Sequence, residues 1–191
     1  INPNGILVGP TGRINTAGFV ASTLDVPDAE FLAGGNMNFS GPSMAGVVNL
    51  GTITAADGDV ILMARTVENA GAISAPNGVA ALAAGNDILL QAAGDERVVV
   101  KSALPGGGNG VTNSGTIAAA QAALKAAGGN VYALAVNNTG VVRATGIAQR
   151  NGRVILSAAG GVVQNSGTIR AKNINGSGGR VLMSGGKGGK T

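Results

Sequence analysis

Few side chains in this sequence could perform acid–base, nucleophilic or metal chemistry. The 191 residues include no cysteine and no histidine, which excludes thiol catalysis, imidazole as a general base and the usual zinc, haem and iron–sulfur sites. Three pairs of carboxylates stand out: Asp25 with Asp28, Asp57 with Asp59, and Asp95 with Glu96. Asp57 and Asp59 flank a glycine, which is typical of a solvated turn rather than a catalytic site. We therefore expect no catalytic residue, no metal site and no cofactor.

Asparagines recur in a nine-residue phrase that appears five times, with the template V-x-N-x-G-x-I-x-A. The five asparagines are Asn49, Asn69, Asn113, Asn138 and Asn165. Successive asparagines are 20, 44, 25 and 27 residues apart, and we interpret the step of 44 as two steps of 22. A period of about 20 to 27 residues with short β-type segments is the signature of a solenoid.

The alternation within the phrase indicates how a coil is built. The valine, asparagine, glycine, isoleucine and alanine occupy alternate positions, so in a strand they share one face. Small apolar side chains suit a narrow interior, and glycine suits a position without room for a Cβ atom. An inward asparagine at the same point of successive coils can bond the asparagines above and below it. We expect these five residues to form a structural ladder rather than to bind a ligand.

The fold class that follows is all-β, a parallel β-helix of about eight coils in a single domain spanning residues 1–191. Each phrase is followed by a second strand-like run, such as Asp59–Ala64 or Arg153–Ala158. Two segments do not follow this repeat. Residues 23–46 are predicted to leave the stack, and residues 86–110 to form a degenerate coil with strands at 88–90 and 98–100 and a loop at 104–108.

Two short helices are expected beside the coils. Pro27 before residues 28–33, with Gly34 after them, favours a helical turn, and Phe31, Met37 and Phe39 would make that excursion a hydrophobic lid. Residues 118–128 consist mostly of alanine, which favours a helix by propensity.

The charges divide along the chain. All nine acidic residues lie in residues 1–96 with two basic residues, and residues 97–191 hold eleven basic residues and no acid. In a solenoid, position in the sequence becomes position along the axis, so one end would be acidic and the other basic. Such a rod is suited to head-to-tail association. Five basic residues are candidates for contact with a polyanion: Arg143, Arg153, Arg170, Lys172 and Arg180.

Composition narrows the partners further. Only three phenylalanines and one tyrosine are available for stacking on bases, so we expect no nucleic-acid partner. No apolar run reaches the roughly 18 residues that a membrane-spanning helix needs. Binding of anionic host glycans such as heparin stays open as an alternative function. A polysaccharide-active β-helix enzyme is a more distant alternative, because the second half of the chain has no carboxylate.

The N-terminal sequence resembles a known family. The residues that carry the likeness are Asn2-Pro3-Asn4-Gly5-Ile6, Gly18-Phe19-Val20-Ala21-Ser22-Thr23-Leu24-Asp25 and Phe31-Leu32-Ala33-Gly34. With the repeated phrase, they closely resemble the two-partner secretion, or haemagglutination-activity, domain of filamentous haemagglutinin-like adhesins. That domain normally begins further upstream with a capping segment, so we expect the family domain to be N-terminally incomplete here.

The resemblance implies a right-handed β-helix at the N-terminal end of a very large exoprotein. It implies export through an outer-membrane transporter of the Omp85 type, and a location outside a Gram-negative bacterium or on its surface. Asn2 to Ile6 correspond to the family's secretion motif, although Asn-Pro followed by Asn-Gly is also a strong β-turn former. The predicted function is that of a non-enzymatic rod for adhesion or surface structure, which stacks head to tail or continues into further repeats, with host receptors among its partners.

Overall fold

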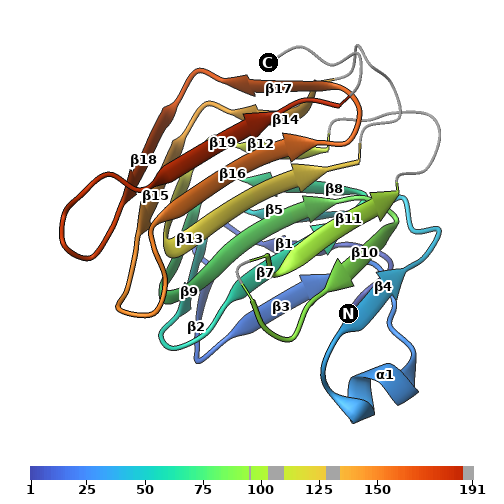
Figure 1. The fold of residues 1–191 in the computed structure, drawn as a ribbon. Helices are drawn as coiled ribbons and strands as arrows, with labels where there is room; N and C mark the ends of the chain where they lie inside the picture. The colour runs from blue at the N-terminus through green and yellow to red at the C-terminus, as the bar shows by residue number, and fades with distance from the viewer. Residues whose placement is uncertain (95, 103–109, 128–133, 187–191) are drawn as a thin grey trace.

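The computed structural model describes residues 1–94, 96–102, 110–127 and 134–186, and these form a parallel β-helix (Figure 1). Each coil contributes one strand to each of three faces. The first face consists of β1 (Ile6–Val8), β5 (Gly46–Asn49), β8 (Thr66–Asn69), β12 (Val111–Asn113), β14 (Leu134–Asn138) and β17 (Val162–Asn165), in this order. All neighbours on this face are parallel.

The second and third faces are joined in the middle of the stack, where two long strands bend from one face to the other. The second face holds β2 (Arg13–Thr16), β6 (Thr52–Ala55), β9 (Ala72–Ala84), β13 (Thr116–Ala126), β15 (Val141–Thr145) and β18 (Thr168–Lys172). The third face holds β3 (Phe19–Ser22), β7 (Val60–Ala64), the second halves of β9 and β13, β16 (Arg153–Ala158) and β19 (Arg180–Ser184).

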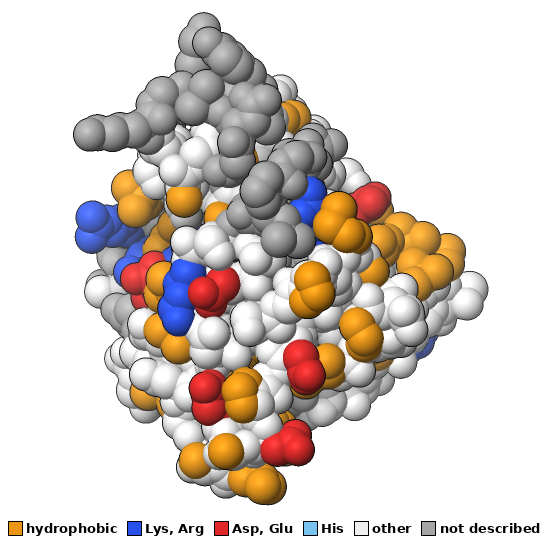
Figure 2. Space-filling model, turned by 90° about the vertical axis from the view of Figure 1, so that its right-hand side faces the viewer, with side chains coloured by type: hydrophobic (Ala, Val, Ile, Leu, Met, Phe, Trp, Pro, Cys, Tyr) orange, Lys and Arg blue, Asp and Glu red, His pale blue; other side chains and the backbone are white. Residues whose placement is uncertain are grey.

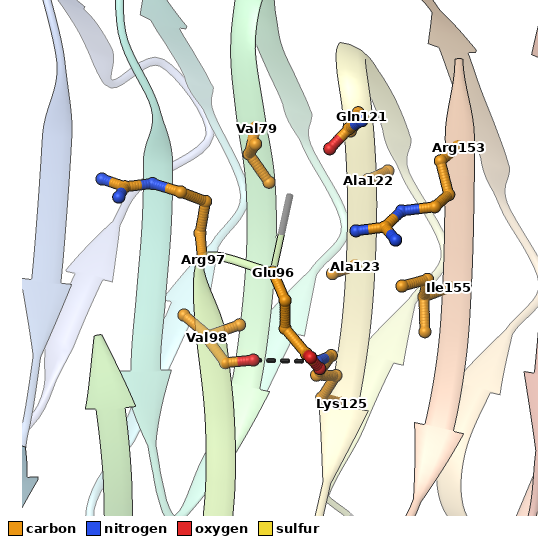
Figure 3. Close-up of a pocket in the computed structure, with 10 residues that line it drawn as sticks. All are labelled: Val79, Glu96, Arg97, Val98, Gln121, Ala122, Ala123, Lys125, Arg153 and Ile155. Carbon is orange, nitrogen blue, oxygen red and sulfur yellow. Dashed lines mark hydrogen bonds and ion pairs between the residues drawn. The ribbon is translucent and has the colours of Figure 1, made fainter. Parts of the chain in front are cut away.

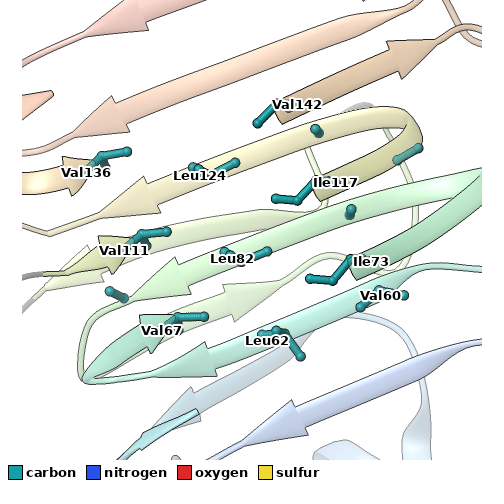
Figure 4. Packing of buried hydrophobic residues seen from close by; sticks show 14 of the residues in the cluster. Val60, Leu62, Val67, Ile73, Leu82, Val111, Ile117, Leu124, Val136 and Val142 are labelled. Carbon is teal, nitrogen blue, oxygen red and sulfur yellow. The ribbon is translucent and has the colours of Figure 1, made fainter. Parts of the chain in front are cut away.

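The interior of the stack is made of equivalent residues from successive coils. Val67, Val111 and Val136 lie above one another on the first face, and leucines such as Leu82 and Leu124 do so on the third (Figure 4). The strands of the first two faces alternate between buried and partly exposed residues, for example in β5 and β6. The alternation in the repeated phrase therefore predicts correctly which side chains face inward.

The stack has six coils in the described residues, so the estimate of about eight is too high. The error comes from the step of 44 residues between Asn69 and Asn113. These residues are direct neighbours, because β8 pairs with β12. The intervening residues 86–102 do not form a degenerate coil. They contribute β10 (Asp87–Leu90) and β11 (Val98–Ser102) to a separate antiparallel sheet, and the expected loop at 104–108 lies outside the described residues.

This antiparallel sheet, with the order β4-β10-β11, covers part of the third face and is called the flanking sheet below. Its first strand, β4 (Met37–Ser40), comes from the excursion at residues 23–46. A second hydrophobic cluster fills the space between the flanking sheet and the stack: Leu24, Val26, Phe39, Ile61, Met63, Val79, Ala81, Ala83, Ile88, Leu90, Val98 and Ala123.

The helix expected in the excursion is present as α1 (Asp28–Ala33), with Gly34 after it at a φ of 65°. Of the three residues expected to form a lid, Phe39 is buried and Met37 packs against the second cluster. Phe31 is 64% exposed, so the prediction that it belongs to the lid is wrong. On the side of the flanking sheet, the cluster is filled instead by Leu24, Val26 and residues of the antiparallel strands.

The helix expected at 118–128 is absent, since residues 116–126 form the long strand β13. Tertiary contacts override the helical propensity of the alanines. The backbone of β13 is paired on one side with β9 and on the other with β15 and β16. Alanine suits these positions because the coils lie close together around a narrow interior.

Three ion pairs lie within the flanking sheet or between it and the stack, and they change the charge distribution predicted from the sequence. They join Arg97 to Asp59 at 2.6 Å, Lys101 to Asp87 at 3.7 Å, and Lys125 to Glu96. These pairs neutralise charge near the middle of the stack. The other bases described after residue 110 lie on the last two coils. Figure 2 shows acidic and hydrophobic side chains in the lower part of one face, nearest the N-terminal coils. No helix among the described residues is long and apolar enough to cross a membrane.

Candidate functional site

The residues Asn2 to Ile6 form a β-turn that leads into β1. The backbone N–H of Gly5 donates to the carbonyl oxygen of Asn2 at 3.1 Å, and the N–H of Asn4 donates to the Asn2 side-chain oxygen at 3.0 Å. Gly5 has a φ of 111°, which favours glycine over other residues. Residues 1–4 are exposed. The motif is therefore a preformed turn on the surface.

Two further hydrogen bonds attach this turn to other segments. The N–H of Asn2 donates to the carbonyl oxygen of Ser22 at the end of β3, at 2.9 Å. The Ser43 hydroxyl donates to the carbonyl oxygen of Pro3 at 2.7 Å. Ile6 packs against the interior of the first coil. The turn is thus fixed between the first coil and the segment that returns from the excursion.

A hollow of about 420 Å³ lies beside the turn. It is lined by Ile1, Pro3, Thr23, Asp25, Ser40, Gly41, Pro42, Ser43 and Met44. Ile1 and Met44 are 61% and 66% exposed, so the hollow offers apolar contact together with one carboxylate. The sequence does not predict this hollow. The Gly-Pro-Ser run at residues 41–43 indicates a turn, but nothing in it indicates that the turn lies against residues 1–3.

The five repeated asparagines form one hydrogen-bonded column. Each side-chain N–H donates to the side-chain oxygen of the asparagine in the next coil, at 2.7, 2.7, 2.6 and 2.6 Å from Asn49 to Asn165. The four asparagines before Asn165 are completely buried. Buried amides that bond one another hold the corner in register and present no group to a ligand.

The five basic residues named from the sequence lie on the two last coils. Arg143 is directly opposite Arg170 on the second face, and Arg153 is directly opposite Arg180 on the third. Lys172 lies two residues beyond Arg170 in β18. Arg143 also lines a hollow of about 280 Å³ with seven other residues: Ser74, Pro76, Ala118, Ala119, Thr145, Gly146 and Ile147. The five residues are thus divided between two faces rather than gathered in one pocket.

The carboxylate pairs do not form an acid–base site in the described residues. Asp59 accepts a hydrogen bond from the N–H of Val79 at 2.8 Å and pairs with Arg97, and Asp25 accepts from the N–H of Val26 at 2.9 Å. Asp95 lies outside the described residues. Within the described part of the chain, no group of three or more acidic side chains could hold a metal ion.

A narrow cleft between the flanking sheet and the stack is occupied by structural contacts (Figure 3). The Lys125 ammonium donates to the carbonyl oxygen of Val98 at 2.8 Å and pairs with Glu96. The Lys125 side chain is only 8% exposed. The volume of the cleft is about 10 Å³, which leaves space for roughly one water molecule.

Comparison with known proteins connects this architecture to a family. A search of curated proteins gives no significant match. Among solved structures, the chain is similar to the HMW1 secretion domain from Haemophilus influenzae, with a TM-score of 0.79 and 30% sequence identity. The alignment covers 96% of this chain and 49% of that chain, so this chain spans about half the length of its relative. The model of the TPS secretion domain family matches residues 1–171. The expected resemblance is confirmed: the chain belongs to the TPS, or two-partner secretion, domain family.

Proposed function

We propose that this domain directs the export of a larger exoprotein through an Omp85-type outer-membrane transporter of a Gram-negative bacterium. The family match over residues 1–171 is the observation that carries the proposal. The exposed Asn-Pro-Asn-Gly turn supports it as a point of contact. Its own hydrogen bonds preform the turn, so little conformational entropy would be lost on binding.

Export assays with a matched pair of asparagine variants would test the role of this turn. Asn175 is an exposed asparagine whose side-chain oxygen accepts the N–H of Ser177 at 3.0 Å, as Asn2 accepts the N–H of Asn4 at 3.0 Å. We expect Asn2→Ala to reduce the exoprotein secreted by cells carrying the transporter several-fold, and Asn175→Ala to leave it unchanged. Equal secretion of the two variants would contradict a role for the turn.

The exported molecule is proposed to form a non-enzymatic rod that serves adhesion or surface structure. In the described residues, the strands of the last coil have no strand partner beyond the coil below them. Such an edge favours pairing with another coil. That coil would come from a further repeat of the same exoprotein or from a second copy stacked head to tail into fibres. Sedimentation at low and high salt distinguishes the two: a monomer under all conditions would contradict the fibre.

Binding of anionic glycans on host cells is a second candidate, supported by the opposed arginines. Like charges on adjacent strands repel, which a bound polyanion would relieve. We expect retention on a heparin column that a salt gradient reverses, and earlier elution of Arg170→Ser. Arg13→Ser, at the other end of the same face, should elute like the unchanged protein. Equal elution of both variants would exclude the last coils as the contact surface.

A further inference from the structure

The hollow of about 280 Å³ beside Arg143 lies on the second face, and the strand register explains its shape. Ala118 of β13 lies between two polar residues, because it pairs with Ser74 of β9 on one side and with Arg143 of β15 on the other. The short alanine side chain leaves space between these two neighbours. Ala118, Ala119 and Pro76 supply the apolar part of the lining.

A closed turn forms one wall of this space, which is called the Arg143 hollow below. Gly146 and Ile147 of the turn are among its lining residues. The N–H of Ile147 donates to the carbonyl oxygen of Arg150 at 2.8 Å, and the N–H of Arg150 donates back to Ile147 at 3.0 Å. The N–H of Gly146 donates to the carbonyl oxygen of Lys172 at 2.8 Å, which fixes the turn to the neighbouring strand. The wall is therefore formed before any ligand binds, so little conformational entropy would be lost on binding.

The polar side chains of the Arg143 hollow can all donate hydrogen bonds. They are the guanidinium of Arg143 and the hydroxyls of Ser74 and Thr145, and no acidic residue is among the described residues that line the hollow. Within the described ranges, none of these three side chains has a hydrogen-bond or ion-pair partner. Arg170 and Lys172 lie opposite Arg143 and Thr145 in the next strand and add positive charge. The hollow thus offers unpaired donors in a positive field, which favours an anion.

We propose that the Arg143 hollow binds a sugar unit that carries a phosphate or sulfate ester. The proposal rests on the binding of anionic glycans proposed above, and it names one site and one kind of group for that binding. A guanidinium can donate two parallel N–H groups to such an ester, whose remaining oxygen can accept from the hydroxyls. The volume of about 280 Å³ is slightly below the usual range for drug-sized ligands, which suits a single sugar unit. The apolar lining would lie against the carbon atoms of the ring.

A titration of the unchanged protein with three forms of glucose tests the proposal directly. The sugar carries a phosphate ester, a sulfate ester or neither on its primary hydroxyl, and binding is followed by NMR. We expect both charged sugars to bind at least about tenfold more tightly than glucose, because only they engage Arg143. Tighter binding of the phosphate would indicate a bacterial surface saccharide as the source, and tighter binding of the sulfate a host glycan. Binding of the charged sugars no tighter than that of glucose would overturn the proposal.

A matched pair of arginine variants assigns the binding to the hollow. Arg143→Ser should weaken the binding of the charged sugars about tenfold. Arg180→Ser removes the same charge from an exposed position on the third face, outside the hollow, and should leave the binding unchanged. Equal weakening by the two variants would mean that the sugars respond only to net charge, and it would overturn the proposal.

The substitution Ala118→Val separates this hollow from polyanion binding in general. It fills the space between Ser74 and Arg143 without changing any charge, and valine is well suited to a strand. We expect the charged sugars to bind several-fold more weakly, with retention on heparin unchanged. Folded Ala118→Val that binds them as tightly as the unchanged protein would overturn the proposal, and the arginine pair tests it if this variant does not fold.

The two measurements also separate the hollow from the proposed glycan function. A protein that is retained on heparin but binds the charged sugars no more tightly than glucose would overturn the hollow alone. A protein that binds the charged sugars in the hollow but is not retained on heparin would support the hollow and contradict heparin-like polymers as the ligand.

Discussion

The coil stack and the flanking sheet are both β structure, but different interactions hold them in place. The stack is parallel and repeats the same contacts in each coil, as the four equivalent asparagine bonds show. The flanking sheet is antiparallel and depends on contacts that occur once, such as the ion pair of Arg97 with Asp59 and the bond from Lys125 to Val98. Stability in the stack is therefore shared among coils, as in other solenoids, whereas in the flanking sheet it depends on individual side chains.

The largest expected effect concerns the glycines two residues after the ladder asparagines. A Cβ atom at Gly115 would collide with the carbonyl oxygen of Gly71 in the coil below. Because this atom is backbone at the corner between β8 and β9 and accepts the N–H of Thr116 at 2.9 Å, it cannot move aside without separating two coils. We expect Gly115→Ala to lower the free energy of unfolding by about 3 kcal/mol, measured by urea denaturation.

A matched glycine serves as the control for this prediction. A Cβ atom added at Gly178 would meet nothing within 4 Å apart from its own chain neighbours, and Gly178 does not have a positive φ. Gly178→Ala should change the stability by less than about 0.5 kcal/mol. A similar small effect at Gly115 would show that the coils can separate easily, and that the repeated contacts of the stack do not make it rigid.

A smaller loss is expected from the ladder itself. Asn113→Ala removes two rungs and leaves the Asn69 amide and the Asn138 oxygen buried without their partners. We expect the free energy of unfolding to fall by about 2 kcal/mol. Asn165→Ala removes one rung at the partly exposed end and should cost about half as much. If the two variants lose equal stability in urea denaturation, the position of a rung within the stack does not matter.

The repeated part of the fold can be predicted from the sequence because each coil repeats the same alternation of inward apolar residues, asparagine and glycine. The alternation in Val47–Ala55 or Val111–Ala119 is sufficient to assign the inward face and the asparagine corner. The flanking sheet cannot be predicted in this way, since β4 and β10 are about 50 residues apart and carry no repeated pattern. For the same reason the sequence indicates strands at 88–90 and 98–100 but not how they pair.

The candidate site likewise has one part that the sequence predicts and other parts that it does not predict. The turn at Asn2–Gly5 is determined by local residue types, so its position and its form follow from the sequence. The adjoining hollow depends on where the chain returns at Pro42 and Ser43, which the sequence leaves open. The arginine pairs require the strand register, because Arg143 and Arg170 become opposed only when the coils are aligned.

The smallest expected effect comes from a substitution that weakens the contact between the flanking sheet and the stack. Lys125→Met removes the ion pair with Glu96 and the bond to Val98, while the methionine stem still fills the buried position. Loss of these bonds is partly offset because no charge is then buried, so we expect the free energy of unfolding to fall by about 1 kcal/mol.

Hydrogen exchange should accelerate in β11 and stay slow in β8 and β12, since the flanking sheet would open while the coils stay folded. Lys101→Ala is the control: its pair with Asp87 is 3.7 Å long, and both this pair and its hydrogen bond to Asn38 are exposed, so exchange in β11 should change much less. Faster exchange in β8 and β12 of Lys125→Met would mean that the two regions unfold together, and that the repeated contacts of the stack do not protect it from events in the flank.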